Sequence, residues 1–413
     1  MDLLLLISST ALLAIFLWTI YHVPILLTGV RCRGDKNVSN PLLLPKFSII
    51  VPAKDEEAVI ERCIKALLET DYPSEKIEII IVEGGSRDLT GKICDRLQKC
   101  YPNIIKVIHE YSPRGKPSAL NLALSYATGE IIGVFDADSV PEKDVLKKVA
   151  LYFQDPRITA VQGRPLPLNE RQNMLTKIAA KEERAWFQAL LKGRDVLGLF
   201  VPLTGSCQFI KRSTLDEVGG WDAGSLAEDV EMALTLTEKG YIIKYADDVR
   251  FWQEIPDNLR DMKTQRVRWY RGCMEAAFKY ARLLKKPSKK TIDAEISLVG
   301  PFIMVLCLII YLTWLALIIR SSNQLTNLLL NPAAISTLLT IFSLFSLGLA
   351  LIFSDKPINI ENILWLPFIY AYWFLQLSIA GQALIEILLH KPKVWRKTAK
   401  HGYRDKRVFS GNG

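Results

Sequence analysis

Four apolar segments constrain the fold of this chain most strongly, because each is long enough to cross a lipid bilayer. They span about residues 3–27, 297–319, 333–353 and 363–389. A membrane-spanning helix needs about 20 predominantly apolar residues. Half of the 413 residues are hydrophobic and the mean hydropathy is +0.16, which is too apolar for an ordinary soluble protein. The sequence therefore predicts an integral membrane protein with one anchor before a more polar region and further segments after it.

The charges beside the first apolar segment indicate its orientation. Asp2 precedes the segment, whereas Arg31, Arg33 and Lys36 follow it. A cleaved secretory signal would carry basic residues in front and a small-residue cleavage site behind. Because basic residues collect on the cytoplasmic side of membrane segments, we expect a permanent anchor that places the next domain in the cytosol.

A basic C-terminal tail conflicts with a simple count of membrane crossings. The net charge is +9, and many of the cations follow the last apolar segment: Lys391, Lys393, Arg396, Lys397, Lys400, Arg404, Lys406 and Arg407. Such a tail favours the cytoplasmic membrane face, yet three crossings after a cytosolic domain would place it outside. One segment is therefore expected not to cross. Residues 363–389 are the candidate, because Pro367, Gln376, Gly381, Gln382 and Glu386 interrupt them.

Between the first two apolar segments, predicted strands alternate with helices. Buried strands are expected at about residues 47–52, 77–82, 104–108 and 131–135. The segment after Glu56 repeats its apolar residues at helical spacing. This alternation predicts an α/β fold whose mostly parallel sheet is covered by helices on both faces. A helix at about residues 276–286 mixes apolar and basic residues, which fits either the membrane surface or an amphipathic core helix.

Two carboxylates, Asp136 and Asp138, directly follow the fourth predicted strand. Ligands of open α/β sheets collect at the carboxyl ends of the strands. Carboxylate oxygens suit Mg²⁺ or Mn²⁺, which usually also bind a diphosphate. Aspartate is equally an ordinary turn residue, so the pair taken alone also fits a solvated turn.

Three further features accompany this pair in a fixed order. They are an acidic, glycine-rich turn at 83–88, the acids Glu228 and Asp229 at a predicted helix start, and the pentapeptide 265–269 with the pattern QxxRW. Together with the membrane segments, these motifs resemble the membrane-integrated family 2 glycosyltransferases, which include cellulose, chitin and hyaluronan synthases and ceramide glucosyltransferase. The resemblance runs from about residue 46 to residue 271.

The resemblance implies a GT-A-like α/β fold and sugar transfer with inversion at the anomeric carbon. It implies that Asp136 and Asp138 bind the metal ion, Mg²⁺ or Mn²⁺, and the donor diphosphate. Asp229 corresponds to the general base that takes a proton from the acceptor hydroxyl. Chemistry supports this role, because a carboxylate within hydrogen-bond reach is a suitable base. An acid pair that complements a helix dipole is the simpler alternative for Glu228 and Asp229.

The QxxRW motif implies contacts with both substrates. Gln265 and Arg268 correspond to residues that close over the diphosphate, where an arginine stabilises the charge of the leaving group. Arg268 is therefore also expected to be catalytic. Trp269 corresponds to an acceptor-binding residue, and a membrane-interface anchor is its alternative role.

The nucleotide-binding half departs from the family pattern in one respect. Relatives usually carry two adjacent aspartates in the early turn, whereas this chain has Glu83 followed by Gly84. We expect Pro52, Glu83 and Lys116 to contact the nucleotide donor. A solvated loop lysine is the alternative for Lys116.

The acceptor-binding half is expected to use two loops of the family pattern. Gly205 and Ser206 lie in the first loop and Trp221 in the second, and Glu228 and Asp229 complete the predicted acceptor site. The glycines of these loops also fit simple turns.

These features predict five parts of the chain: an anchor (1–30), a GT-A-like catalytic domain (45–255), a QxxRW and interfacial helix region (256–292), a C-terminal membrane region (293–390) and a basic tail (391–413). The predicted function is inverting transfer from a nucleotide sugar, with a UDP-sugar favoured, to a growing polysaccharide at the cytosolic membrane face. Transfer of one sugar to a lipid is the alternative.

The sequence also bears on other partners and on other classes of protein. A polymer channel built from so few helices is expected to need oligomerisation or an accessory subunit. No nucleic-acid-binding motif occurs, so nucleic acid is not expected as a partner. The seven scattered cysteines fit a reducing compartment and argue against zinc. A transporter would need more charged or broken helices at membrane depth. An inactive glycan-binding protein is disfavoured by the intact motifs.

Overall fold

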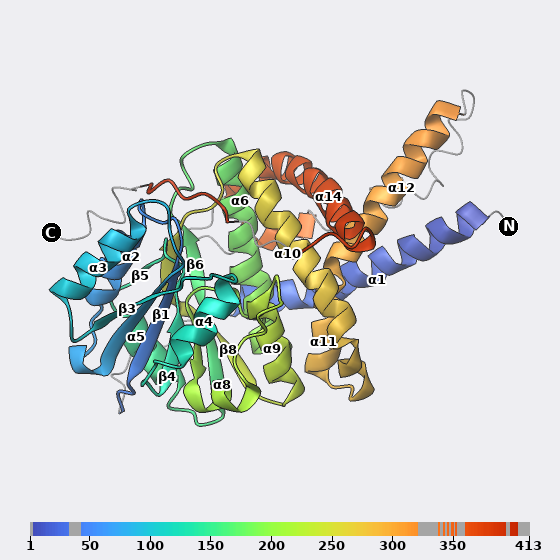
Figure 1. Ribbon diagram of the computed structural model, residues 1–413. Coiled ribbons are helices and arrows are strands. Elements are labelled where there is room, and N and C mark those ends of the chain that lie inside the picture. The colour runs from blue at the N-terminus through green and yellow to red at the C-terminus, as the bar shows by residue number, and fades with distance from the viewer. Residues whose placement is uncertain are drawn as a thin grey trace. The chain divides into compact units, whose positions relative to one another are not determined.

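The computed structural model describes residues 3–32, 43–320, 360–393 and 397–403, together with residues 338, 342, 345, 346, 348–350 and 352 (Figure 1). The chain forms two compact units, each built from separate stretches of sequence. The sheet unit contains residues 34–180, 200–262 and 397–413. The helical unit contains residues 1–33, 181–199 and 263–396.

Eight strands among the described residues form one sheet of the order β3-β2-β1-β4-β7-β6-β8-β5. The strands are β1 (Phe47–Ala53), β2 (Ile77–Glu83), β3 (Ile105–His109), β4 (Ile131–Val134), β5 (Val140–Pro141), β6 (Ile158–Pro167), β7 (Gln208–Lys211) and β8 (Ile242–Gln253). Neighbouring pairs β1–β2, β1–β4, β2–β3 and β6–β8 are parallel, whereas β4–β7, β6–β7 and β5–β8 are antiparallel. The prediction of a mostly parallel α/β sheet is confirmed.

Helices cover both faces of the parallel half of this sheet. The connections from β1 to β2 and from β2 to β3 run in one direction through α2 (Ile60–Leu68) and α3 (Thr90–Cys100). The connection from β3 to β4 runs back through α4 (Lys116–Leu124). Because such crossovers are right-handed, α2 and α3 lie on one face and α4 on the other (Figure 1).

The rest of the sheet unit contains the helices η1 (Ser74–Lys76), α5 (Val145–Tyr152), α8 (Arg212–Val218) and α9 (Glu228–Glu238). It also contains the first residues of α6 (Met174–Ala185). Helix α6 follows β6, and the sequence analysis predicted neither of these two elements.

Four phenylalanines form the centre of the sheet unit's core. Phe47, Phe135, Phe209 and Phe251 are almost fully buried. The Phe135 ring lies edge-on to Phe209 and Phe251, with centroid distances of 5.7 and 6.2 Å. Burying each ring contributes on the order of 1.5–3 kcal/mol. Since Phe135 directly precedes Asp136, this packing fixes the place where the chain leaves the sheet.

The helical unit begins with α1 (Leu3–Arg31) and continues with η2 (Trp186–Leu191) and α7 (Lys192–Val196). Most of α10 (Leu259–Tyr280) belongs to it, followed by η3 (Ala281–Lys285), α11 (Lys289–Leu298), α12 (Gly300–Arg320), η5 (Ile360–Trp365) and α14 (Leu366–Leu388). A buried ion pair connects three of these helices. Arg194 of α7 and Asp293 of α11 approach to 3.5 Å, and Tyr21 of α1 donates a 2.9 Å hydrogen bond to Asp293.

Two helices of the described residues are long and apolar enough to cross a membrane, namely Thr10–Arg31 and Ile360–Leu388. A bent pair, Lys289–Leu298 with Gly300–Thr313, would be a third span if the two helices cross together. These segments correspond to the first, fourth and second apolar segments predicted from the sequence. Most of the third, residues 333–353, lies outside the described residues, as do Arg33 and Lys36.

Candidate active site

Asp136 and Asp138 lie at the carboxyl end of β4, beside the carboxyl end of β1. The order of the sheet reverses between these two strands, and such switch points bind ligands in open α/β sheets. The turn is held by hydrogen bonds: the backbone N–H of Ser139 donates to the Asp136 carbonyl, and the N–H of Asp136 donates to the Ser206 hydroxyl. Ser206 therefore positions the carboxylate turn.

A lysine links Asp136 to the acidic start of α9. The Lys116 Nζ atom donates to Asp136 Oδ1 at 2.5 Å and to the Gly205 carbonyl at 2.7 Å, and it lies 3.7 Å from Glu228 Oε1. Burial alone would lower the pKa of Lys116, but Asp136 and Glu228 raise it above its ordinary value. Lys116 therefore stays charged, and it is not a solvated loop lysine.

Asp229 lies beside the same lysine. It occupies the first turn of α9, and its Oδ1 atom accepts a hydrogen bond from the N–H of Val230 at 2.8 Å. Gly205 adopts a φ of +82°, and a Cβ atom there would lie 3.0 Å from Asp229 Oδ2 and 3.1 Å from Lys116 Nζ. The structure thus brings Lys116, Asp136, Gly205, Glu228 and Asp229 together.

Trp221 is held by Asn121 of α4, the helix that begins at Lys116. The Asn121 side chain accepts a hydrogen bond from the Trp221 N–H and donates one to the Trp221 carbonyl. Trp221 is 3 % exposed, and among the described residues its Nε1–H has no hydrogen-bond partner. Trp221 is therefore buried, and its predicted role in acceptor binding stays a prediction.

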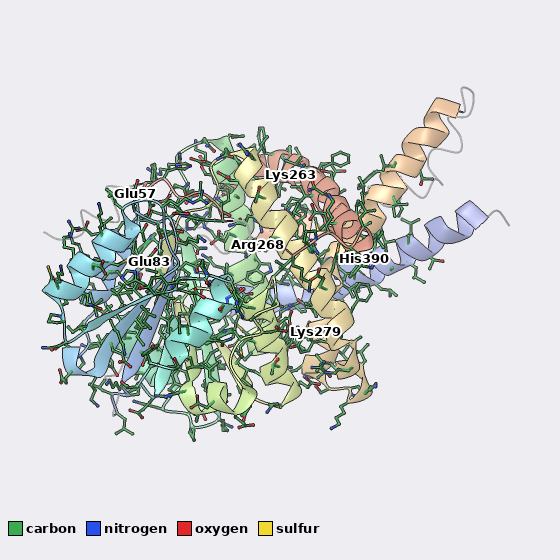
Figure 2. All side chains as sticks on the ribbon, in the orientation of Figure 1. Glu57, Glu83, Lys263, Arg268, Lys279 and His390 are labelled. Carbon is green, nitrogen blue, oxygen red and sulfur yellow. The ribbon has the colours of Figure 1, made fainter. Side chains whose placement is uncertain are left out.

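Glu83, at the end of β2, is satisfied by the protein itself (Figure 2). Its Oε1 atom accepts a 2.5 Å hydrogen bond from the Ser86 N–H, and its Oε2 atom accepts a 3.0 Å bond from His109 Nδ1. Burial opposes ionisation of Glu83, but the bonds from Ser86 and His109 bring its pKa below the usual value. Pro52 lies partly buried in the neighbouring strand β1.

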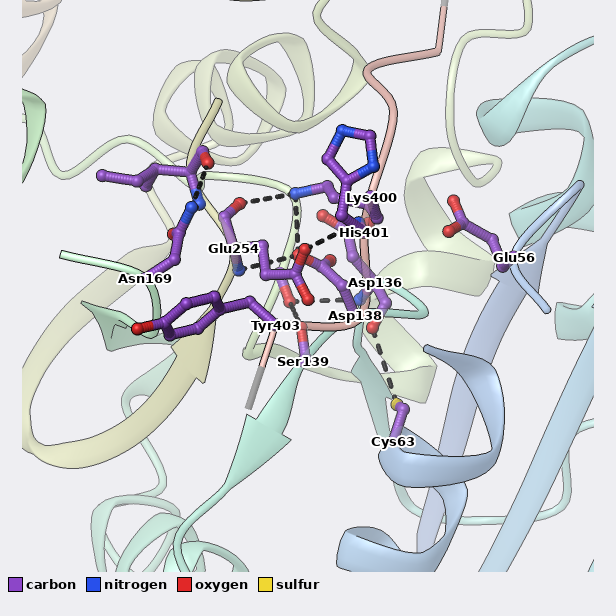
Figure 3. A network of polar contacts seen from close by, with 12 residues as sticks. Glu56, Cys63, Asp136, Asp138, Ser139, Asn169, Glu254, Lys400, His401 and Tyr403 are labelled. Atoms are coloured by element: carbon purple, nitrogen blue, oxygen red, sulfur yellow. Dashed lines mark hydrogen bonds and ion pairs between the residues drawn. The ribbon is translucent and has the colours of Figure 1, made fainter. Parts of the chain in front are cut away.

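The C-terminal segment, Lys397–Tyr403, lies against the Asp138 side of the site (Figure 3). The Lys400 Nζ atom donates to Asp138 Oδ2 at 2.7 Å and to the Glu254 carbonyl at 2.6 Å. The backbone N–H of Glu254 donates to the same Oδ2 atom at 3.0 Å. Asp138 is thereby held by two donors that come from distant parts of the sequence.

The basic tail was expected from the sequence only to mark the cytoplasmic membrane face, and the partners of its lysines were not predicted. Lys397 pairs with Glu56 at 3.0 Å and Lys400 with Asp138. Burial raises the pKa of Glu56 to about 7, although Lys397 opposes this shift. Lys400 and Asp138 are 262 positions apart in the chain, and no local pattern in the sequence indicates that they pair.

The QxxRW residues lie in the part of α10 that belongs to the helical unit. Gln265, Arg268 and Trp269 are three and four positions apart, so they share one face of the helix. Trp269 is 40 % exposed, and the Arg266 guanidinium lies 4.5 Å from the centre of its ring. Figure 2 marks Arg268 in this helix.

Within the helical unit, Glu182 of α6 contacts Arg266 of this motif and two polar side chains of α14. Its Oε2 atom pairs with Arg266 at 2.9 Å. Its Oε1 atom accepts hydrogen bonds from Trp373 Nε1 at 2.9 Å and Gln376 Nε2 at 2.8 Å. The sequence analysis missed Glu182, because nothing in its local context sets it apart from a surface acid.

The Asp136 and Asp138 carboxylates fit a divalent cation. They are hard oxygen ligands, which Mg²⁺ and Mn²⁺ prefer. In this structure each carboxylate contacts an ammonium group, Asp136 that of Lys116 and Asp138 that of Lys400. A separate group, Asp257, Asp261 and His401, has ligand atoms within 4.8 Å of one another.

Comparison with known proteins identifies the class of this chain. Residues 45–272 match the model of the family described as "Glycosyltransferase like family 2". The chain belongs to this family, and it is therefore a glycosyltransferase that uses nucleotide-sugar donors.

Two curated relatives are similar in sequence to this chain. The chain is 31 % identical over 288 residues to the probable glycosyltransferase YdaM of Bacillus subtilis, covering 67 % of this chain and 68 % of YdaM. It is 38 % identical over 196 residues to the β-monoglucosyldiacylglycerol synthase of Synechocystis, covering 46 % of this chain but only 40 % of that enzyme.

A solved structure shares the fold. The mannosyltransferase PcManGT from Pyrobaculum calidifontis, in complex with GDP-Man and Mn²⁺, has a TM-score of 0.64 and 21 % identity. The match covers 93 % of this chain and 99 % of that one. It supports the GT-A-like architecture.

Proposed function

We propose that this protein transfers a single sugar from a nucleotide-sugar donor to the hydroxyl group of a lipid acceptor, with inversion of configuration. The observation that carries the proposal is the convergence of Asp136, Lys116 and Asp229 around Gly205. This arrangement joins a donor-binding carboxylate to a candidate base. The name of the Synechocystis relative, a glucosyldiacylglycerol synthase, supports a lipid acceptor.

On the donor side, Asp136 and Asp138 would hold a divalent ion. When bound, that ion supplies positive charge to the diphosphate as the leaving group departs. Lys116 adds a further positive charge beside Asp136, at 2.5 Å from its carboxylate. We favour a UDP-sugar as donor, and a GDP-sugar is the second choice because PcManGT was solved with GDP-Man.

On the acceptor side, Asp229 is the proposed general base. It takes the proton of the acceptor hydroxyl while that oxygen bonds to the anomeric carbon. The bond from the anomeric carbon to the diphosphate oxygen breaks, and the nucleoside diphosphate leaves with the bonding electrons. Positioned general bases contribute roughly 10²–10⁴-fold to a rate. A Cβ atom at position 205 would lie 3.0 Å from the Oδ2 atom of Asp229, so a side chain there would press on the proposed base.

We assign Gln265, Arg268 and Trp269 to closure over the diphosphate and the acceptor end. Glu182 supports this role indirectly, because it fixes Arg266 between the motif residues. Trp373 and Gln376 bind the same carboxylate. A polar group so close to a membrane-length helix suits an acceptor with a polar head and an apolar tail.

Polysaccharide synthesis is the second candidate. The QxxRW pattern at 265–269 favours it, because the pattern resembles that of polymerising relatives. The small number of candidate spans among the described residues, two or at most three, weighs towards the lipid acceptor. We place the sheet unit on the cytosolic side of the membrane, because nucleotide sugars are made there and α1 ends in the basic residue Arg31.

A product analysis tests the proposal. Purified protein in lipid nanodiscs is supplied with diacylglycerol and a panel of radiolabelled UDP- and GDP-sugars. We expect one sugar on a solvent-extractable lipid, and no product from the Asp229→Asn variant even though this variant still binds nucleotide. Long water-soluble chains formed early, while acceptor is in excess, would instead establish a polymerase.

A further inference from the structure

The C-terminal segment, Lys397–Tyr403, places its cations and backbone donors on carboxylates around the donor site. Lys397 pairs with Glu56 and Lys400 with Asp138. The backbone N–H of His401 donates to Glu254 Oε2 at 2.9 Å (Figure 3). These contacts place a positive charge or an N–H donor on each of three acidic side chains, Glu56, Asp138 and Glu254. Without these contacts the carboxylates would repel one another.

The segment is seated by specific geometry and does not simply trail across the surface. Arg62 of α2 binds the Tyr403 carbonyl at 2.6 Å and Glu254 at 3.0 Å. Gly402 adopts a φ of +67°, and a Cβ atom there would lie 2.8 Å from the Ala58 carbonyl oxygen. Because no other residue type fits this close approach without strain, Gly402 fixes the position of the segment.

Lys400 provides the contact that matters for the donor site. Its side chain is 16 % exposed, and Asp138 is 4 % exposed. The ammonium neutralises a carboxylate that the proposed function assigns to the divalent ion.

We propose that the C-terminal segment is a latch over the donor site, in which the Lys400 ammonium holds Asp138 until a divalent ion arriving with the nucleotide sugar displaces it. The inference rests on the proposed metal-binding role of Asp136 and Asp138. A divalent ion on Asp138 would lie within a few ångströms of the ammonium, where like charges repel strongly at low dielectric. The diphosphate offsets this repulsion, because it brings negative charge that attracts the displaced lysine.

The latch has a consequence for the order of binding. A divalent ion that binds Asp138 alone leaves the Lys400 ammonium without its carboxylate. When the ion binds together with a diphosphate, the displaced ammonium can pair with the diphosphate. Metal and nucleotide therefore bind as a pair, and the nucleotide-free protein holds the metal weakly.

Binding of Mn²⁺ to the nucleotide-free, full-length protein tests the latch. Free Mn²⁺ is measured by electron paramagnetic resonance at increasing metal concentration. Lys400→Gln removes the competing charge, so we expect about tenfold tighter Mn²⁺ binding, the factor that corresponds to losing one charge-assisted hydrogen bond. Gly402→Ala displaces the segment without altering Lys400 and should shift the affinity in the same direction.

Lys393→Gln is the matched control. It makes the same chemical change in the same basic tail, but Lys393 is 51 % exposed and pairs with Glu275. Its Mn²⁺ affinity should equal that of the unmodified protein. Calorimetric titration with UDP in excess Mn²⁺ shows whether each variant keeps an intact donor site.

Two results would overturn the latch. Unchanged Mn²⁺ affinity in Lys400→Gln, with UDP binding intact, would mean that Lys400 does not compete with the metal. Weaker affinity would make Lys400 a positioning residue that holds Asp138 in place for the metal. The metal site itself is tested separately by Asp138→Asn: if that variant binds Mn²⁺ and UDP like the unmodified protein, the proposed donor site is wrong whatever Lys400 does.

Discussion

Replacing Gly205 by alanine tests the proposed active site most directly. The residue has a φ of +82°, a conformation that costs an alanine about 1–2 kcal/mol. The new methyl group would also lie 3.0 Å from Asp229 Oδ2 and 3.1 Å from Lys116 Nζ. Both contacts are tighter than ordinary van der Waals distances, so the carboxylate and the ammonium must each move by a few tenths of an ångström.

The expected effect on catalysis follows from this displacement. A misplacement of about 1 Å can cost about 100-fold in rate, so a shift of a few tenths should lower kcat by roughly tenfold. Donor affinity should fall less than kcat, because on the donor side the methyl group meets Lys116 and not the proposed metal ligand Asp138. The assay is steady-state transfer of labelled sugar to lipid, combined with UDP binding by calorimetry.

Gly240→Ala supplies the matched control for backbone strain. Gly240 has a φ of +83°, and no atom of the described residues beyond its chain neighbours lies within 4 Å of the position that its Cβ atom would occupy. This variant therefore has the strain without the contact. If Gly205→Ala and Gly240→Ala lose the same stability and both keep full kcat, then Asp229 is not the base or does not lie where we place it.

Three further outcomes are expected. Asp136→Asn should abolish transfer and leave the melting temperature nearly unchanged. EDTA should likewise abolish transfer by the unmodified protein. Full activity of the variant, or of the unmodified protein in EDTA, would exclude a metal at this site. Asp293→Ala should destabilise the helical unit by about 3–5 kcal/mol, because it leaves the buried Arg194 without its carboxylate partner. Thermal unfolding of the purified protein in detergent measures this loss of stability. The hydrogen bond to Glu83 raises the pKa of His109 above 6.5, so the stability that this pair contributes is present below about pH 6.5 and is lost as the pH rises through the folded pKa. His109→Gln should flatten that part of the stability–pH curve, and an unchanged curve would contradict the assignment.

The sequence was most informative where structure depends on neighbouring residues. The strand that precedes Asp136, β4, was predictable, because a short apolar run followed by turn residues has few other conformations. The helical spacing after Glu56 likewise predicted α2, where Ile60, Cys63, Ile64 and Leu67 are buried. Membrane-length segments were evident from hydropathy alone.

The sequence was least informative where contacts join distant residues. A cation after a membrane segment has the same local pattern whether it faces lipid headgroups or a carboxylate, so the pairing of Lys400 with Asp138 was not predicted. The pairing of Glu182 with Arg266 spans 84 positions and is equally invisible in any local window. Glu83 was expected to reach the nucleotide, whereas its oxygens accept bonds from Ser86 and His109, and its role in donor binding remains a proposal.

The ion pair of Arg194 and Asp293 has a consequence for biosynthesis. Tyr21 and Asp293 are 272 positions apart, and a ribosome adds about 5–20 residues per second, so Asp293 is synthesised roughly 14–54 s after Tyr21. During this interval α1 is already made, whereas its carboxylate partner does not yet exist. Arg194 also has to wait for Asp293 before its charge is paired. The helical unit therefore completes its assembly only late in translation, after most of the sheet unit has been synthesised, and until then the first helix lacks its hydrogen bond to Asp293.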